Sequence, residues 1–295
     1  MKGTVSGDTP GVPIPANAVG PTARRRDRRE GRGRTINAGN LFIASCLIVL
    51  FAPVAVLVLF SFNAGTSLSL PFRGFSLRWY DAVLADSQAR QAFANSLVVA
   101  SIVTPLCVIL GLISAYAVAR LPGRWRGLSL GAFSVPLVVP WLVIGIAALI
   151  FFRALGFGTS LVSVVLMQTV VTFPLVTVIL FGRLIGMDPN IEDAGLDLGA
   201  TRLGVIRRVV LPQLVAPLVL STLFALISSL GNFVVTFFVI GYELTVPIWA
   251  YSSLRHPENL PMVNAAATIL FAVNVVAILS VWLVARRDPQ SLGWL

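Results

Sequence analysis

Six long apolar segments dominate this sequence and restrict what it can fold into. They lie at about 39–62, 93–118, 129–152, 161–184, 213–238 and 262–284. About 20 apolar residues are enough to cross the hydrocarbon core of a bilayer as a helix. The composition agrees, because 57% of the residues are hydrophobic and only 12% are charged, against about 25% charged in soluble domains. A transmembrane β-barrel would need shorter segments of alternating polarity. We therefore expect an all-α membrane protein with six transmembrane helices.

Basic residues are distributed unevenly around these segments. The expected spans leave 17 of the 22 Lys and Arg residues on the side of the N-terminus and five on the other side. The side richer in Lys and Arg normally faces the cytoplasm. We therefore expect both termini, and the loop at 185–212, to be cytoplasmic. The arginine run between Arg24 and Arg34 fits an anchor beside anionic membrane lipids, and no nucleic-acid partner is expected.

The sequence predicts three parts. Residues 1–37 are rich in Gly, Pro, Thr and Arg and lack apolar periodicity, which is typical of a disordered basic cytoplasmic tail. Residues 38–288 are expected to form the six-helix transmembrane domain. Residues 289–295 would be a short cytoplasmic C-terminal tail. Prolines inside the spans, among them Pro140, either break helices beside a cavity or make ordinary packed kinks.

Several kinds of chemistry are missing from the chain. Lys2 is the only lysine, so a phosphate-binding loop with an internal lysine is excluded. His256 is the only histidine, which argues against a histidine metal cluster or a catalytic triad. We therefore expect no catalytic residue, no metal site and no cofactor bound by this chain. The spans also lack Asp, Glu, Lys and His, which disfavours a proton-driven pump.

The polar loop between the fourth and fifth spans predicts a helix that lies at the membrane surface. Asp188-Pro189 is a helix-start signal, and Glu192 and Asp193 in the first turn favour the helix dipole. Ala194 and Leu198 are four residues apart and give a short apolar stripe.

A second helix should follow in the same loop. Gly199 suits the left-handed position that ends a helix. We expect the next helix to run from about Thr201 to Val210, and Pro212 to break or kink the entry into the fifth span. The product would be a compact helix–turn–helix on the cytoplasmic face.

This loop resembles a motif of the permease subunits of bacterial ABC importers. The family pattern is Glu-Ala-Ala, three residues, Gly, nine residues, then Ile-x-Leu-Pro. Here Glu192-Asp193-Ala194 is followed by Gly199, and Val209-Val210-Leu211-Pro212 matches the end. Asp193 stands at the second position, where the family pattern has Ala, and Gly199 comes one residue later than in the pattern. The pair Gly199-Ala200 and the spacing to Leu211-Pro212 fit well.

The resemblance identifies the chain as the transmembrane subunit of a type I ABC importer in the bacterial inner membrane. It implies that the loop is a coupling helix that docks into a partner ATPase. The coupling residues carried over are Glu192, Asp193, Ala194, Leu198, Gly199, Leu211 and Pro212. It further implies two ATPase subunits that bind ATP and Mg, a second permease subunit or a second copy, and an extracytoplasmic solute-binding protein.

Within this family the sequence looks closest to spermidine/putrescine-type permeases. The supporting segments are Ser61-Phe62-Asn63, Phe75 to Tyr80, Asn95-Ser96-Leu97 and Asn264 to Ile269. Such permeases often carry acidic residues in the fifth span, whereas this chain has Ser228-Ser229-Leu230-Gly231-Asn232-Phe233. The resemblance implies a polyamine or a related small organic solute, and the missing acidic residues favour a less cationic solute or one recognised mainly by the separate binding protein.

Polar and aromatic residues inside the spans are candidates for the substrate path. They are Gln168, Asn232, Phe233, Thr236, Trp249 and Asn264. Polar residues at such positions also commonly hold neighbouring helices together, and packing and substrate contact both remain open for each of them. The main alternative function is a stand-alone ion-coupled secondary carrier; a membrane-embedded enzyme or scaffold is a more distant one.

Overall fold

The computed structural model describes residue 3 and residues 38–65, 72–188, 190–256 and 259–286. The expected tails, 1–37 and 289–295, therefore lie outside the described residues, apart from Gly3, and remain predictions. Within the described ranges the regular structure is helical, and the single β contact is an isolated bridge between Asn63 and Phe75. The all-α expectation is confirmed for this part of the chain.

The chain divides into two units, and the boundary between them falls within the first helix, α1 (Ala38–Ser61). One unit ends at Leu50 and the other begins at Phe51. The architecture described below is that of the second unit.

Four described helices are long and apolar enough to cross a membrane. They are α1, α3 (Ser87–Ala119), α6 (Leu161–Leu184) and α13 (Leu260–Arg286). Two bent pairs could each supply one more span, which brings the number to as many as six. One pair is α4 (Gly123–Val138) with α5 (Trp141–Ala154), bent by 94°; the other joins Arg202–Gln213 to α10 (Val215–Gly231), bent by 75°.

The third expected span is thus not a continuous helix. Val139 has extended backbone angles and is followed by Pro140. A residue before proline is pushed out of the helical region because the proline ring collides with its backbone. Pro140 therefore breaks this span between α4 and α5, whereas Pro136 lies inside α4.

The fifth expected span is also interrupted. The helix α10 ends at Gly231, Asn232 is extended, and the short helix α11 (Val234–Val239) begins after Phe233. Asn232, one of the residues expected to line the substrate path, therefore lies at a helix break, where backbone groups lose their helical hydrogen-bond partners.

The centre of the larger unit is the contact between α3 and α6, on which α10 also packs. The two helices approach closely at Gly111, where an added Cβ would lie 2.5 Å from Cγ1 of Val176. Glycine is required here because any side chain would push the helices apart. Buried side chains such as Val103, Leu180 and Leu184 fill the rest of this core.

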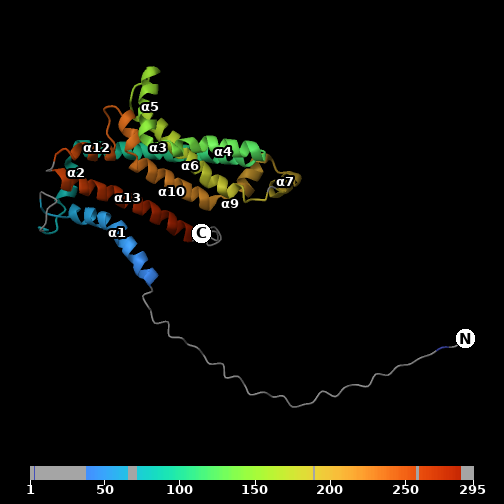
Figure 1. Ribbon diagram of the computed structural model, residues 1–295, viewed down its shortest axis with the longest axis horizontal. Coiled ribbons are helices and arrows are strands. Elements are labelled where there is room, and N and C mark those ends of the chain that lie inside the picture. Colours follow the sequence, from blue (N-terminus) through green and yellow to red (C-terminus); the bar gives the residue numbers. More distant parts are fainter. Residues whose placement is uncertain (1–2, 4–37, 66–71, 189, 257–258, 287–295) are drawn as a thin grey trace, which may run out of the picture. The chain divides into compact units, whose positions relative to one another are not determined.

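The α3 bundle carries different elements at its two ends. At one end lies α7 (Asn190–Asp197), and at the other lies α12 (Val246–Ser253), as Figure 1 shows. These are called the α7 end and the α12 end below. At the α12 end, α2 (Arg78–Ala85), α12 and the first turns of α13 share a second buried cluster around Val83, Trp249 and Ala265.

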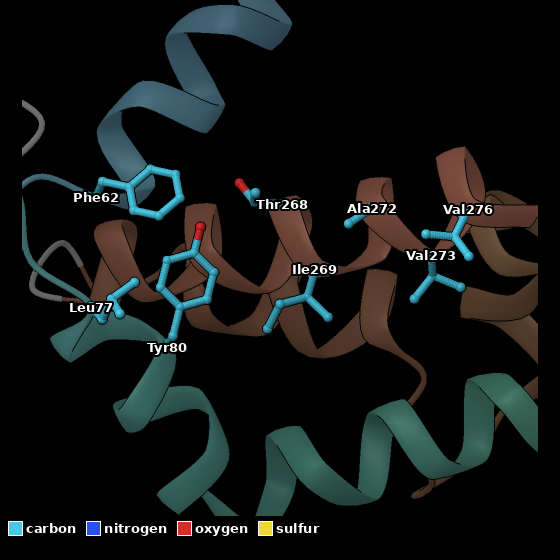
Figure 2. A pocket seen from close by; sticks show the side chains of 8 residues that line it. All are labelled: Phe62, Leu77, Tyr80, Thr268, Ile269, Ala272, Val273 and Val276. Carbon is cyan, nitrogen blue, oxygen red and sulfur yellow. The ribbon is translucent and has the colours of Figure 1, made fainter. Parts of the chain in front are cut away.

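An apolar groove runs along α13 near the α12 end (Figure 2). Ile269, Ala272, Val273 and Val276 of α13 form one wall, and Phe62 and Tyr80 lie at one end. The ring centroids of Phe62 and Tyr80 are 5.2 Å apart, and the Tyr80 hydroxyl shares a hydrogen bond of 2.7 Å with Ser61. A surface so poor in polar atoms suits the hydrocarbon of a bilayer, where apolar side chains meet no penalty.

Candidate functional site

The helix α7 begins as the sequence predicts. Oδ1 of Asp188 accepts a hydrogen bond of 3.0 Å from the backbone N–H of Asn190, which satisfies a donor that helix geometry leaves unpaired. Glu192 and Asp193 lie in the first turn, where negative charge is stabilised by the helix dipole. Pro189, part of the expected start signal, is outside the described residues.

The turn after α7 depends on Gly199. Its φ of +84° lies in the left-handed region, which glycine enters without the steric cost of a Cβ. The N–H of Gly199 donates to the carbonyl of Leu196, and that of Ala200 donates to the carbonyl of Gly195. The left-handed helix end expected at Gly199 is confirmed.

The second helix of the loop is irregular. It consists of α8 (Arg202–Val205), a π-helical segment η1 (Ile206–Val210) and α9 (Leu211–Gln213). Thr201 begins it, because its hydroxyl accepts a hydrogen bond of 3.1 Å from Gly204 N–H. The helix is found where the sequence predicts it, but the wide π turn was not foreseen. The bend expected at Pro212 falls two residues later, at Leu214.

Two side chains from the end of α3 hold the carboxylate of Glu192. Arg120 makes an ion pair with Oε1, and the Tyr116 hydroxyl donates a hydrogen bond of 3.0 Å to Oε2. The guanidinium of Arg120 also lies over the Tyr116 ring, 4.7 Å from its centroid. Glu192 therefore faces inward, toward α3, and its side chain is only 14% exposed.

Other residues of the loop face outward. Leu198 is 88% exposed, and Ile191 and Leu203 are exposed as well. Asp193 and Ala194 are also on the exposed surface. Exposed large apolar side chains outside the hydrocarbon region of a membrane protein favour a contact with another protein. The arrangement can therefore present a short apolar and acidic surface to a partner.

A hollow separates α7 from the end of α3. It is lined by Tyr116, Ala117, Arg120, Glu192, Asp193, Leu196, Arg202 and Val205. On its floor the loop packs tightly, because an added Cβ on Gly195 would lie 3.0 Å from Cγ2 of Val205. The two helices of the loop therefore depend on a small residue at position 195.

A second polar region lies inside the bundle and joins three of the predicted substrate-path residues. Ser229 donates to Oε1 of Gln168 at 2.6 Å, and Nε2 of Gln168 donates to the hydroxyl of Thr236 at 2.9 Å. Thr236 in turn donates to Oδ1 of Asn232 at 3.3 Å. Ser229, Gln168, Thr236 and Asn232 are called the buried polar chain below.

All members of the buried polar chain are closed off from solvent, and Asn232 is 2% exposed. They lie on α6, α10, α11 and the break between α10 and α11. Among the described residues, Nδ2 of Asn232 has no hydrogen-bond partner. This arrangement stabilises the helix break, and it leaves one buried donor for another group.

The remaining predicted substrate-path residues lie elsewhere. Phe233 packs against Phe237 and Tyr251, with ring centroids 5.6 and 5.1 Å away. Trp249 is buried in the cluster with α2 and α13. Asn264 lies on α13 and is half-buried. The structure therefore brings Gln168, Asn232 and Thr236 together, with Phe233 beside Asn232 in the same helix break, and places Trp249 and Asn264 on other helices.

Sequence reasoning missed Tyr116, Arg120, Ser229 and Tyr251. Tyr116 and Arg120 are four residues apart at a helix end, so they share one face, and this spacing was the available signal. Nothing in the sequence indicates that this face meets Glu192, which is 76 residues from Tyr116.

A family model defines the class to which this fold and loop belong. It is described as the binding-protein-dependent transport system inner membrane component, and it matches residues 107–288. The chain therefore belongs to this family and is a permease subunit of an ABC importer, in which a separate subunit is the ATPase.

Two relatives from Escherichia coli (strain K12) have similar sequences. The putrescine transport system permease protein PotI is 35% identical over 253 residues, covering 82% of this chain and 89% of the relative. The spermidine/putrescine transport system permease protein PotC is 28% identical over 261 residues, covering 88% and 97%. The resemblance to spermidine/putrescine-type permeases expected from the sequence is confirmed.

Solved structures show the same fold at lower sequence identity. A bacterial ABC transporter involved in the import of the acidic polysaccharide alginate matches with a TM-score of 0.64 and 15% identity, covering 88% of this chain and 98% of that one. The MetNI methionine ABC transporter, in an inward-facing conformation, matches with a TM-score of 0.56 and 17% identity, covering 68% and 95%. These two importers have different named substrates, so the fold does not define the solute.

Proposed function

We propose that this chain is the permease subunit of a polyamine importer and that α7 is the coupling helix through which a partner ATPase drives it. The observation that carries the proposal is the helix–turn–helix at 188–213, with its outward-facing Leu198 and Asp193. An exposed apolar side chain at a rigid turn fits a binding surface better than a simple connection between two spans.

The structure supports a register of the family motif that is one residue later than the one read from Glu192. The segment Asp193-Ala194-Gly195 stands three residues before Gly199 and so restores the family spacing. In this register the acidic position is the exposed Asp193, and the second small position is Gly195, which packs against Val205. Ala194, Leu198, Gly199, Leu211 and Pro212 keep their proposed roles, and Glu192 acts from the inner face of the same helix.

The proposed membrane orientation follows from the basic residues. Arg120, Arg124, Arg126, Arg202, Arg207 and Arg208 all lie in the segments nearest α7. The positive-inside rule therefore places the α7 end in the cytoplasm. Six spans, with both bent pairs crossing the membrane and both termini cytoplasmic, complete this topology.

The proposed assembly contains a different kind of partner at each end of the bundle. At the α7 end, two ATPase subunits would bind ATP and Mg and grip the coupling helices. At the α12 end, the fully exposed Tyr242 and its neighbour Glu243 would meet an extracytoplasmic solute-binding protein. A second permease subunit, or a second copy of this chain, would complete the path across the membrane.

The proposed solute is a polyamine, on the strength of two relatives named for putrescine or spermidine transport. The spans lack acidic residues. The path of a polyamine would therefore have to be lined by aromatic faces, such as those of Phe233 and Tyr251, and by the free donor and acceptor groups of helix breaks. Aromatic rings attract cations through their electron-rich faces. A neutral or less cationic solute fits these residues as well, so the test also measures the uptake of methionine.

The proposal is tested by reconstituting the chain with its ATPase, second permease subunit and binding protein in liposomes. We expect ATP-dependent uptake of labelled putrescine or spermidine that stops when ATP is replaced by a non-hydrolysable analogue. Uptake of methionine under the same conditions is the control for specificity. Accumulation by this chain alone under a sodium or proton gradient would instead support the ion-coupled carrier.

A further inference from the structure

The contact between Glu192 and α3 is more specific than a surface ion pair. Exposed pairs of opposite charge usually contribute little, because both side chains lose freedom and solvent screens the attraction. Here both carboxylate oxygens have different partners, Arg120 on one and Tyr116 on the other. The Arg120 guanidinium is further fixed over the Tyr116 ring, so three side chains hold one another in a single arrangement.

This arrangement is a direct side-chain link between α7 and the end of α3. The hollow beside it shows that the two helices are not packed along their length there. The backbone of α7 is otherwise held to its own loop, through Gly195 against Val205 and the turn at Gly199. A force on α7 can therefore reach α3 directly through Glu192, in addition to the packing of the loop on the core.

The other end of α3 is fastened to the turn between α11 and α12 in a comparable way. Nδ2 of Asn95 donates to Glu243 at 3.1 Å and to the carbonyl of Leu244 at 2.8 Å. The hydroxyl of Ser96 accepts a hydrogen bond of 2.9 Å from the N–H of Val246. The same continuous helix thus holds the coupling loop at one end and the opposite turn at the other (Figure 1).

We propose that Tyr116 and Arg120 are positioning residues that fasten α7 to α3 through Glu192, so that a displacement of α7 moves α3 and the turn held by Asn95 and Ser96. This inference rests on the proposed function of α7 as the coupling helix. It also gives two neighbouring acidic residues different roles. Glu192 transmits the displacement from α7 to α3, and Asp193 faces the partner ATPase.

The link itself is tested on the purified chain, without any partner. Arg120→Gln and Tyr116→Phe remove its two donors, and we expect amide hydrogen exchange in α7 to accelerate about threefold to tenfold because local opening becomes easier. Arg124→Gln is the matched control, since Arg124 lies over Trp125 on α4 and not on Glu192. Exchange in α7 that is unchanged in both test variants would overturn the link.

The transmission is tested in the assembled importer, with the ratio of putrescine molecules taken up to ATP molecules hydrolysed as the readout. For Arg120→Gln we expect ATP hydrolysis to continue while this ratio falls about threefold or more. The charge-swapped pair Arg120→Glu with Glu192→Arg should recover part of the ratio, which a general loss of folding would not allow. Asp197→Asn, a carboxylate on the same helix, should leave the ratio unchanged.

The outcomes distinguish this inference from the function on which it rests. If the wild-type assembly hydrolyses ATP but takes up no putrescine, the proposed solute is wrong, and the exchange experiment still decides the link. If the wild type transports and Arg120→Gln transports with an unchanged ratio, the transmission through Glu192 is wrong and the proposed function stands.

Discussion

The loop at 185–212, which is proposed to couple to the ATPase, and the buried polar chain both interrupt an apolar protein with polar residues, but these residues find their partners in different ways. The loop leaves Asp193 and Leu198 exposed and ties only Glu192 back to the bundle. The buried polar chain is closed to solvent, and its hydrogen bonds run from one member to the next. A polar group in the membrane has to form its hydrogen bonds within the protein, whereas one at the surface can bind water until a partner protein replaces it.

Residue type alone does not distinguish a surface that contacts a partner from a side chain that packs inside the bundle. Gln168 and Glu192 are both polar residues with defined partners in the same fold. Removing a buried member should lower stability, and removing an exposed loop residue should leave stability intact and weaken assembly. The following substitutions test this division, from the largest expected effect to the smallest.

Gly199→Val should have the largest effect, on the coupling loop. A β-branched side chain at φ +84° costs about 1–3 kcal/mol and deforms the turn. We expect transport to fall at least tenfold and the ATPase to be lost on co-purification. Gly199→Asn is the control, because asparagine tolerates the left-handed region, and its transport should stay close to wild type. Equal losses in both variants would contradict the role of the backbone angle.

Gln168→Leu should produce the largest loss of stability. The side chain is buried, and its removal leaves the hydroxyls of Ser229 and Thr236 without their shared partner. A buried polar group left unpaired costs about 1–3 kcal/mol. We expect a lower thermal unfolding temperature of the purified chain in detergent, with ATPase co-purification unchanged. An unfolding temperature equal to that of the wild type would show that this chain of hydrogen bonds does not stabilise the fold.

Asn232→Ala should separate packing from transport. It removes a buried amide whose Nδ2 has no partner among the described residues and whose Oδ1 accepts only a long hydrogen bond of 3.3 Å from Thr236, so the loss of stability should lie at the low end of the range of about 1–3 kcal/mol for an unpaired buried group. If Asn232 also serves the substrate path, putrescine uptake should fall several-fold at that small cost. Uptake and unfolding temperature are measured on the same preparation. A large loss of stability with normal uptake per folded molecule would assign Asn232 to packing alone.

Leu198→Ala should have the smallest effect on the chain itself. Its side chain is 88% exposed, and surface substitutions of this kind usually change stability by less than about 0.5 kcal/mol. We expect an unchanged unfolding temperature and a weaker affinity for the ATPase, measured by titration of the purified partner. Leu254→Ala, at the end of α12 and also exposed, is the control and should not change this affinity.

Much of the fold follows from patterns that act over one helix. The apolar segments located the long helices, including α6 at the expected bounds of 161–184. The acidic first turn, Gly199 and the start of the second helix at Thr201 were also readable, because capping and turn chemistry depend on a few adjacent residues.

The remaining features depend on contacts between distant segments. Pro140 made a kink or a break possible, but the 94° bend depends on what α4 and α5 pack against. The partners of Glu192 could not be read from the sequence, because side-chain identity does not tell which helix ends meet. The same holds for Trp249, whose aromatic ring suited a cavity wall equally well before the structure placed it in a buried cluster.

The close contact between Gly111 and Val176 lies between the two points at which α3 is attached to other elements, so it can serve as a pivot if α3 tilts. Gly111 stands about seven residues from the Tyr116 and Arg120 attachment and about 16 from Asn95, or roughly 10 and 24 Å at 1.5 Å per residue. A rigid α3 that tilts about this point moves its α12 end about twice as far as its α7 end. A shift of about 2 Å imposed on α7 would then carry the opposite turn by nearly 5 Å, in the reverse direction. This ratio follows from the position of Gly111 along α3, and a bulkier residue there would open the contact with α6.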